Sequence, residues 1–374
     1  MLRIVVICLF SLIVLIGLSA SVLDAFYGGG DAFPERTSVP ELPEEALEKV
    51  ADLPYPPGNI AVSNSGHVFF TFHPEGRPAY NLAELVEGEA QPLRIEDDIN
   101  FETVLSIRID QQNRLWILDY ANHGSGQPKL AAIDLDSRKV VHRYEFPSDI
   151  AGLGSHLNDF QVSRDGATIF IADASILGLD PAIIVYDVQQ KSARRVLDDH
   201  ESVEPDKYVP VVASQKMLMF GVFAIRPGVD SIALDRRNEW LYFAPVTDLH
   251  MHRVRVSDLL DQSLSGEALA ERVERFAEKT MSDGITTDDQ GNIYLSDLEH
   301  DAITRLNSQG ALSTLIRNDE LRWPDGFSFG PNGWLYVTAS ALHYVIAKPD
   351  SYIAEKGPYQ IFRVQTGNTA TPGH

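Results

Sequence analysis

A short segment recurs six times along this chain, and the repeat constrains the fold more than any other sequence feature. Each copy is an apolar stretch, a polar turn and a second apolar stretch that contains an aromatic residue. Apolar residues alternate with polar ones in these stretches, which is the period of a β-strand and not of a helix. The copies span residues 58–71, 105–119, 158–173, 230–245, 283–297 and 325–339.

The turn of each copy has a restricted composition. Only Gly and Asn occur at its centre, and these residues tolerate the positive φ that a tight hairpin requires. The turn residues are Gly66, Asn113, Gly166, Asn238, Gly291 and Gly333. Each copy therefore predicts a β-hairpin.

Further strand-like stretches follow the hairpins, for example over residues 129–146 and 182–197. Four strands in a repeat of about 40–50 residues are typical of a propeller blade. The sequence therefore predicts an all-β, six-bladed β-propeller with four-stranded blades, and a β-sandwich is the less favoured alternative. Residues 257–280 are expected to form a surface helix within blade four, capped by Ser257 or Asp258.

The N-terminus resembles an export signal. Arg3 precedes an apolar run over residues 4–18, and Leu18-Ser19-Ala20 is an acceptable cleavage site. We expect a signal peptide over 1–20, a linker over 21–50, the propeller over 51–366 and a disordered tail over 367–374. The protein is then exported, either periplasmic or secreted, with an uncleaved membrane anchor as the alternative and no other stable membrane span.

Net charge limits the kinds of partner that the chain can bind, and the cysteine content limits how the fold is stabilised. The formal net charge of −22 disfavours nucleic acid and favours cations, although a soluble acidic surface would explain it equally. Cys8 is the single cysteine and lies in the expected signal, so stability must come from a large core instead of disulfides.

The repeat also predicts which residues meet near the axis. Counting eight positions back from each turn residue gives Gly58, Leu105, Asn158, Asp230, Asp283 and Asp325. Three neighbouring carboxylates in one channel would repel one another unless protons or a cation lay between them. No Lys or Arg occupies these six positions, so a divalent cation, Ca²⁺ above all, is expected at Asp283 and Asp230 with Asn158 contributing. Alternatively, each Asp caps the turn that precedes its own strand.

Other polar residues are weaker candidates. His156 precedes the pair Asn158-Asp159, and further histidines stand in comparable loops at His123, His250, His252, His300 and His343. A histidine in a loop is usually solvated, although its pKa suits acid–base chemistry. The motifs of serine hydrolases, zinc proteases and phosphate-binding loops are absent from the sequence.

Several segments resemble one known family. Residues 101–121, 128–147, 157–175, 181–196 and 229–248 are similar, in this order, to the blade motifs of major royal jelly proteins and insect Yellow proteins. Residues 283–297 and 324–337 look closer to gluconolactonases and senescence marker proteins. The resemblance implies a bacterial member of the type described as related to L-dopachrome tautomerase.

The lactonase relatives also imply roles for particular residues. They hold a divalent metal with a Glu from blade one, an Asn from blade four and an Asp from blade five. By blade order Asp283 matches the Asp, Asp230 stands in place of the Asn, and Gly58 or Asn59 stands in place of the Glu. Asn158-Asp159 matches a pair that faces the substrate, and some Yellow-type propellers bind small aromatic amines.

Three functions remain open at this point. The protein could bind or isomerise a small aromatic or quinone-type molecule in its channel, with ligand contacts from Asn158, Asp159, Asp325 and His156. It could be a metal-dependent lactonase that uses metal-bound water. It could also be an interaction scaffold without chemistry, because fold does not fix function.

Overall fold

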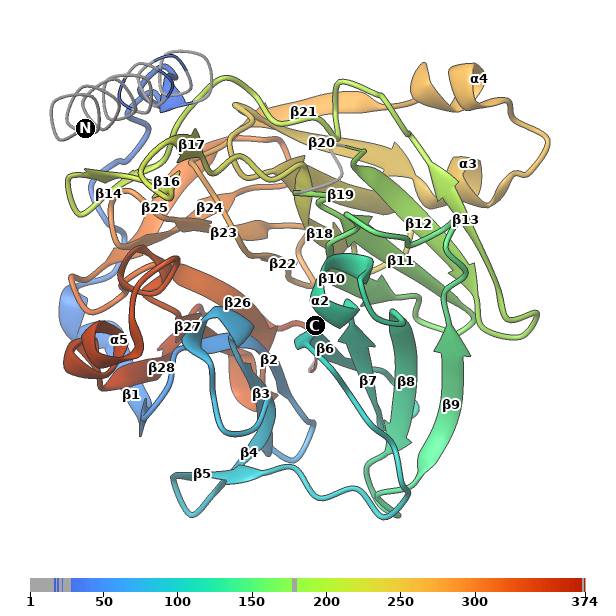
Figure 1. Cartoon of the computed structure of the whole chain (residues 1–374), viewed down its shortest axis with the longest axis horizontal. Helices are drawn as coiled ribbons and strands as arrows, with labels where there is room; N and C mark the ends of the chain where they lie inside the picture. The colour runs from blue at the N-terminus through green and yellow to red at the C-terminus, as the bar shows by residue number, and fades with distance from the viewer. Residues whose placement is uncertain are drawn as a thin grey trace, which may run out of the picture.

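The computed structural model describes residues 28–176 and 180–371, together with the single residues Gly17, Ser19, Val22 and Gly373. Six four-stranded antiparallel sheets surround one axis (Figure 1), which confirms the predicted six-bladed propeller. The predicted signal peptide over 1–20 lies outside the described residues apart from Gly17 and Ser19. Within the described part of the chain, no helix has the length and apolar character needed to cross a bilayer.

Each blade runs outward from the axis. The strands are, for blade one, β2 (Pro57–Val62), β3 (Val68–Phe72), β4 (Leu82–Val86) and β5 (Glu89–Pro92); for blade two, β6 (Val104–Ile109), β7 (Arg114–Asp119), β8 (Lys129–Asp134) and β9 (Val140–Glu145); for blade three, β10 (Leu157–Val162), β11 (Thr168–Asp173), β12 (Ala182–Asp187) and β13 (Ser192–Val196); for blade four, β18 (Val229–Leu234), β19 (Trp240–Pro245), β20 (His250–Arg255) and β21 (Glu274–Glu278); for blade five, β22 (Ile285–Thr287), β23 (Ile293–Asp297), β24 (Ala302–Leu306) and β25 (Leu312–Arg317); and for blade six, β26 (Pro324–Phe329), β27 (Trp334–Ala339), β28 (Tyr359–Gln365) and β1 (Leu47–Leu53).

The hairpin turns adopt the backbone conformation that their composition predicts. All six turn residues have positive φ, from 55° at Asn238 to 84° at Gly66. The innermost strands β2, β6, β10, β18, β22 and β26 then contact one another in sequence, and β26 returns to β2. The ring is therefore closed.

Blade six joins the two ends of the chain. Its outer strand β1 precedes blade one in sequence and pairs with β28 near the C-terminus, Leu53 opposite Tyr359 and Leu47 opposite Val364. β1 begins at Leu47, inside the stretch expected to be a linker. The residues before it run along blade five, where the backbone N–H of Leu42 donates to the Leu315 carbonyl at 2.9 Å.

The helix predicted over 257–280 is wrong. This stretch holds two short helices, α3 (Val256–Leu260) and α4 (Gly266–Ala270), and then β21, the outer strand of blade four. Ser265 caps α4 and Gly266 begins it, so the glycine that weakens a continuous helix starts a new one. β20 needs an outer partner for its backbone groups, and β21 supplies it.

Two further segments lie at the ends of the channel. Residues 207–229, here called the lid segment, form two small hairpins, β14 (Val211–Val212) with β15 (Gln215–Lys216) and β16 (Leu218–Met219) with β17 (Phe223–Ala224). At the other end, Gly373 lies between two inner strands, because its N–H donates to the Phe329 carbonyl and its carbonyl accepts from the Ile109 N–H. Asn368, in the tail expected to be disordered, donates to Asp288 at 2.8 Å. Gly373 therefore lies at the end of the channel where the inner strands β6 and β26 finish.

Candidate functional site

A cavity opens where the inner strands begin. The space available to the centre of a water-sized sphere is about 140 Å³. Its lining includes Asn59, His73, Leu105, Arg108, Tyr120, His123, His156, Asn158, Asp159, Ile176, Met219, Ile225, Asp230, Asp283, Trp323, Asp325 and Leu342. All the residues predicted for ligand or cation contact, namely Asn158, Asp159, His156, Asp230, Asp283 and Asp325, line this one cavity.

Irregular pairing at the strand entries places these side chains. The register of β10 shifts between Leu157 and Phe160, and the intervening residues are Asn158 and Asp159. A similar register shift occurs around Asp230 in β18, and another occurs around Asp325 and Gly326 in β26. A bulge breaks the alternation of a strand and re-aims the extra residue, which turns these polar side chains toward the axis.

Three carboxylates each accept a hydrogen bond from a neutral donor. Asp230 accepts from the Asn158 side-chain amide, and Asp283 Oδ2 accepts from the Trp323 indole N–H at 2.7 Å. Asp325 Oδ2 accepts from the Ser340 hydroxyl at 2.7 Å. These hydrogen bonds orient the three carboxylates, but none of the three donors carries a positive charge that would neutralise them.

Burial and mutual repulsion perturb the acidity of this cluster. Burial raises the pKa of Asp283 to about 6, although the Trp323 hydrogen bond opposes that rise. Burial also raises the pKa values of Asp230 and Asp325 well above the usual range, and the charge of Asp283 raises both further. The cavity therefore resists three negative charges and favours protons or a cation beside them.

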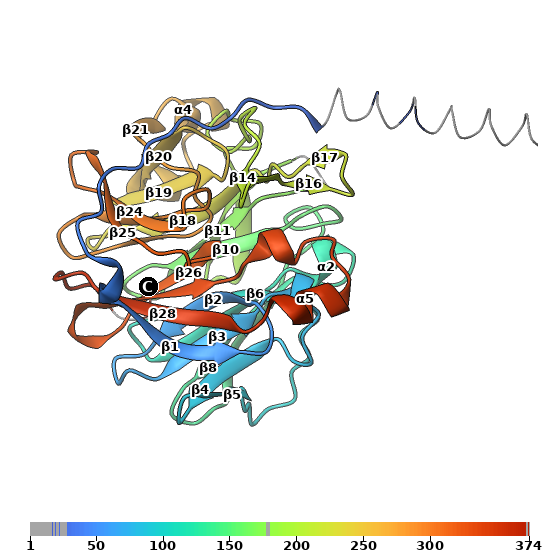
Figure 2. The ribbon, with the colours of Figure 1, turned by 90° about the vertical axis from the view of Figure 1, so that its left-hand side faces the viewer.

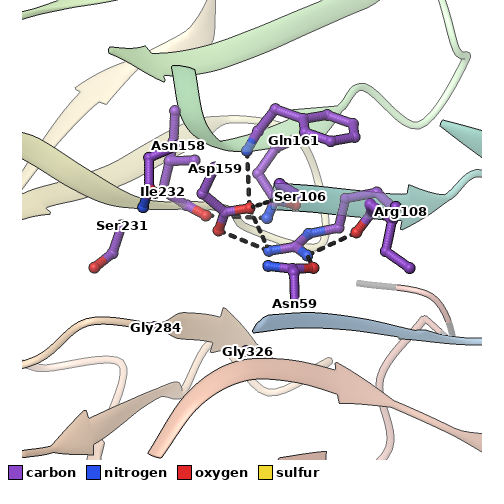
Figure 3. A network of polar contacts seen from close by, with 12 residues as sticks. Asn59, Ser106, Arg108, Asn158, Asp159, Gln161, Ser231, Ile232, Gly284 and Gly326 are labelled. Atoms are coloured by element: carbon purple, nitrogen blue, oxygen red, sulfur yellow. Dashed lines mark hydrogen bonds and ion pairs between the residues drawn. The ribbon is translucent and has the colours of Figure 1, made fainter. Parts of the chain in front are cut away.

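Arg108 is a cavity-lining residue that the counted register missed. Its guanidinium is 1% exposed, and Nη2 donates to both oxygens of Asp159 at 2.7 Å (Figure 3). Nη1 donates to Asn59 Oδ1, and Ser106 Oγ donates to Asp159 at 2.7 Å. A charged residue inside the apolar strand 104–109 was the available signal, because such a residue is rarely buried without a partner.

Glycines allow the inner strands to approach. A Cβ built on Gly284 would lie 1.7 Å from the Asp325 carbonyl oxygen, closer than any real contact. The Asp-Gly pair at 283–284 therefore packs directly against the next blade, and the Asp keeps its place at the axis.

An aromatic wall faces the cavity from blades two and three. Tyr120 and His156 have ring centroids 4.6 Å apart, and the Nδ1 atoms of His156 and His123 are 3.0 Å apart. Burial lowers the pKa of His156 to about 3, and burial lowers the pKa of His73 to about 4. These rings are neutral at physiological pH, so the wall offers stacking surfaces and neutral hydrogen-bonding atoms.

The remaining candidate histidines serve other contacts. His252 Nε2 lies 2.6 Å from Asp248 and His250 lies 3.6 Å from it, while His300 lies between Asp297 and Glu35. His343 stacks on Trp323 with ring centroids 6.2 Å apart, behind the cavity wall. Of the histidines singled out by sequence, only His123 and His156 line the cavity.

The donor set fits a divalent cation poorly. Among the described residues, no three His, Cys, Asp or Glu side chains are grouped as a metal site. Asn59, at the place of the lactonase Glu, is held by Arg108, which brings a positive charge to that side. The Ca²⁺ expectation at Asp283, Asp230 and Asn158 stays a prediction.

Comparison with known proteins agrees with this architecture. The profile of the major royal jelly protein family matches residues 102–365. Major royal jelly protein 3 of Apis mellifera is 27% identical over 164 residues, which cover 41% of this chain and 28% of that protein. Yellow-related salivary protein M10 of Phlebotomus duboscqi is 28% identical over 149 residues, 35% of this chain and 37% of that protein. The matched stretches thus span well under two thirds of these relatives.

Solved propellers share the fold at low identity. A gluconolactonase from Xanthomonas campestris superposes with a TM-score of 0.55 at 14% identity, over 90% of this chain and 97% of that one. The calcium-binding protein regucalcin from Agrobacterium tumefaciens gives 0.56 at 14% identity, over 91% and 100%. These likenesses concern the fold, whereas the family profile covers most of the sequence. The chain belongs to the major royal jelly protein family.

Proposed function

We propose that this protein binds a small aromatic molecule with an amino group in its central cavity. The ammonium group would lie against Asp230, Asp283 and Asp325, and the ring would pack on Tyr120 and His156. The observation that carries the proposal is the meeting of a buried carboxylate cluster and an aromatic wall in one cavity.

Charge balance supports a cationic ligand. Arg108 donates two hydrogen bonds to Asp159, so its positive charge mainly neutralises that carboxylate. The three other carboxylates have only neutral donors in direct contact. A ligand ammonium would supply the missing positive charge and donate up to three hydrogen bonds.

Cavity size supports a single ring. A space of about 140 Å³ is close to the roughly 150 Å³ of an apolar protein cavity that takes up benzene. Leu105, Met219 and Ile225 give the cavity an apolar lining that suits the ring, and Asp230, Asp283 and Asp325 give it acidic groups. This division matches the usual build of a ligand pocket.

An isomerase of aromatic or quinone-type substrates is a second candidate. The family resemblance implies a relation to L-dopachrome tautomerase, and the pKa of about 6 at Asp283 suits a group that gives and takes protons near neutral pH. In this reading Asp283 would exchange the proton, and the neutral histidines would accept hydrogen bonds from ring hydroxyls.

Replacing one acid tests the binding proposal. We expect Asp283→Asn to weaken the binding of tyramine by about ten- to a hundredfold, because a charge-assisted hydrogen bond contributes about 1.5–3 kcal/mol. The exposed Asp319→Asn removes the same charge outside the cavity and should leave the affinity unchanged. Isothermal titration calorimetry measures both, and equal affinities in all three proteins would contradict the proposal.

Export is part of the proposed function. Arg3 and the apolar run over 4–18 support a protein that acts outside the cytoplasm, cleaved near Ala20. Intact-mass measurement on fractionated cells would show a mature chain lacking these residues, and full-length protein in the cytosolic fraction would oppose export.

A further inference from the structure

The lid segment carries an apolar tip into solvent beside the cavity mouth. Phe220, at the turn of the β16–β17 hairpin, is 77% exposed, and Phe223 is 40% exposed. Leu153, in the loop packed beside α2 (Ala121–Gly124), is 84% exposed. Figure 2 places β16, β17 and α2 on one face of the propeller. Phe220 and Phe223 stand on one small hairpin, so they form an exposed apolar tip of the kind that marks an interaction surface.

The backbone at this tip is an unusual place for phenylalanine. Phe220 has φ 53° and is followed by Gly221 at φ 70°. Two successive left-handed residues form the kind of tight hairpin turn in which Asn and Gly are the ordinary choices. The bulky ring gains little from burial in the fold and costs backbone energy, so its role lies outside the folded chain.

The charge of the lid segment differs from that of the whole chain. Residues 207–229 contain no Asp or Glu but three basic residues, Lys207, Lys216 and Arg226, of which Lys207 pairs with Asp31 at 2.6 Å, whereas the chain as a whole has 53 acidic and 31 basic residues. Aromatic side chains flanked by basic ones are the composition that binds at the headgroup boundary of a lipid bilayer. An anionic bilayer surface complements this local charge better than it complements the rest of so acidic a molecule.

The N-terminal part of the chain joins the body at the base of the same segment. The Asp31 N–H donates to the Lys207 carbonyl, and the Val209 N–H donates to the Asp31 carbonyl. Asp31 lies thirteen positions after Leu18, the end of the apolar run, and even a fully extended chain of that length reaches only about 45 Å. Under the proposed export this run would enter a membrane before cleavage, which would bring the lid face near the bilayer.

We propose that the lid segment docks on a lipid bilayer surface, with Phe220 and Phe223 inserted among the headgroups and Lys216 beside the phosphates. The cavity mouth then faces the membrane, because Met219 and Ile225 of the same segment line the cavity. This docking does not depend on which ligand the cavity binds, and it would hold for an empty cavity as well.

A fluorescent label at the tip tests the proposal in the full-length chain. Cys8→Ser removes the single thiol, and Phe220→Cys then carries an environment-sensitive dye. The matched control is Gln190→Cys, an exposed residue in the β12–β13 turn at the opposite end of the blades. Vesicles contain phosphatidylcholine with a minor share of phosphatidylglycerol, with and without lipid-borne quencher.

We expect blue-shifted emission and quenching by the lipid-borne quencher for the label at position 220 and neither change at position 190. Vesicle-bound protein in which both labels stay in water would overturn the proposal, since the chain would then be held by its N-terminus alone. Equal shifts at both positions, or no association with vesicles, would also overturn it. Circular dichroism of each labelled protein checks that the propeller is intact.

Discussion

At the scale of single residues, Asp283 is the most informative side chain. It is half-buried between blades, it is acidic, and its hydrogen-bond donor is the neutral indole of Trp323. A carboxylate that only capped its own turn would bond local backbone N–H groups, whereas this one reaches across to the next blade. The alternative reading of Asp283 as a turn cap is therefore less favoured than a role at the cavity.

The predicted cation can be tested at the same residue. If Ca²⁺ binds at Asp283 and Asp230, millimolar Ca²⁺ should raise the melting temperature relative to EDTA, because a ligand of the folded state alone stabilises it. Asp283→Asn should reduce that rise. Equal melting temperatures in EDTA and Ca²⁺ for both proteins, measured by differential scanning calorimetry, would remove the cation from consideration.

Trp323 is expected to position Asp283 and to set its acidity. Trp323→Phe keeps an aromatic ring and removes the N–H. The hydrogen bond that is lost favours the charged carboxylate by about 1.5–3 kcal/mol. The pKa of Asp283 should then rise by about one to two units, and the pH at which tyramine binding reaches half its maximum should rise with it. Trp334→Phe, far from the cavity, is the control, and an unmoved pH midpoint in Trp323→Phe would refute this role.

At the scale of elements, the strand entries position the site and β1 closes the ring. The bulges at the start of β10, β18 and β26 re-aim polar residues, and β1 ties the N-terminus to blade six. Neither feature is local in sequence: a bulge depends on the partner strand, and β1 lies more than 300 residues from its partner β28.

Closure by β1 leads to a stability prediction. Leu53, at the end of β1, is 1% exposed within the core that joins blades six and one. Leu53→Ala should lower the free energy of unfolding by about 2–5 kcal/mol, since it leaves a cavity in packed apolar surroundings. Urea denaturation measures this free energy, and the exposed Lys49→Ala is a nearly neutral control. An equal loss of stability in both variants would contradict ring closure by β1 as the source of that stability.

The sequence predicts the secondary-structure elements better than it predicts which strands and side chains they contact. Periodicity and turn chemistry identified the six hairpins, because both are local properties of the chain. The counted register brought Asn158, Asp230, Asp283 and Asp325 to one cavity, since equivalent positions of a repeat converge at the axis. It missed Arg108, which enters three residues deeper, and it mistook β21 for a helix because strand pairing is decided by tertiary contacts.

At the scale of the whole molecule, burial sets the direction of a pH effect on stability. The folded-state pKa of Asp283, about 6, exceeds its ordinary value of 3.8, so its contribution to stability is complete below about pH 4. That contribution is lost as the pH rises through about 6, because the folded state must then hold a buried negative charge. Asp230, Asp325 and Asp159 face the same cavity and act in the same direction, while Arg108 and Lys279 oppose it.

A cationic ligand should reverse this trend. Its ammonium group favours the ionised Asp283, so binding releases a proton below pH 6 and becomes tighter as the pH rises. The chain as a whole, with its net charge of −22, also attracts the ligand at every pH above the range of the acids.

The most direct measurement compares tyramine with 4-ethylphenol, its analogue without the amino group, by calorimetric titration between about pH 5 and about pH 8. We predict that the affinity for tyramine rises by up to about tenfold per pH unit as the pH rises to about 6, where Asp283 ionises. The affinity for 4-ethylphenol should stay lower and should not rise with pH. Equal affinities for the two compounds at every pH would contradict an amine site at the carboxylate cluster.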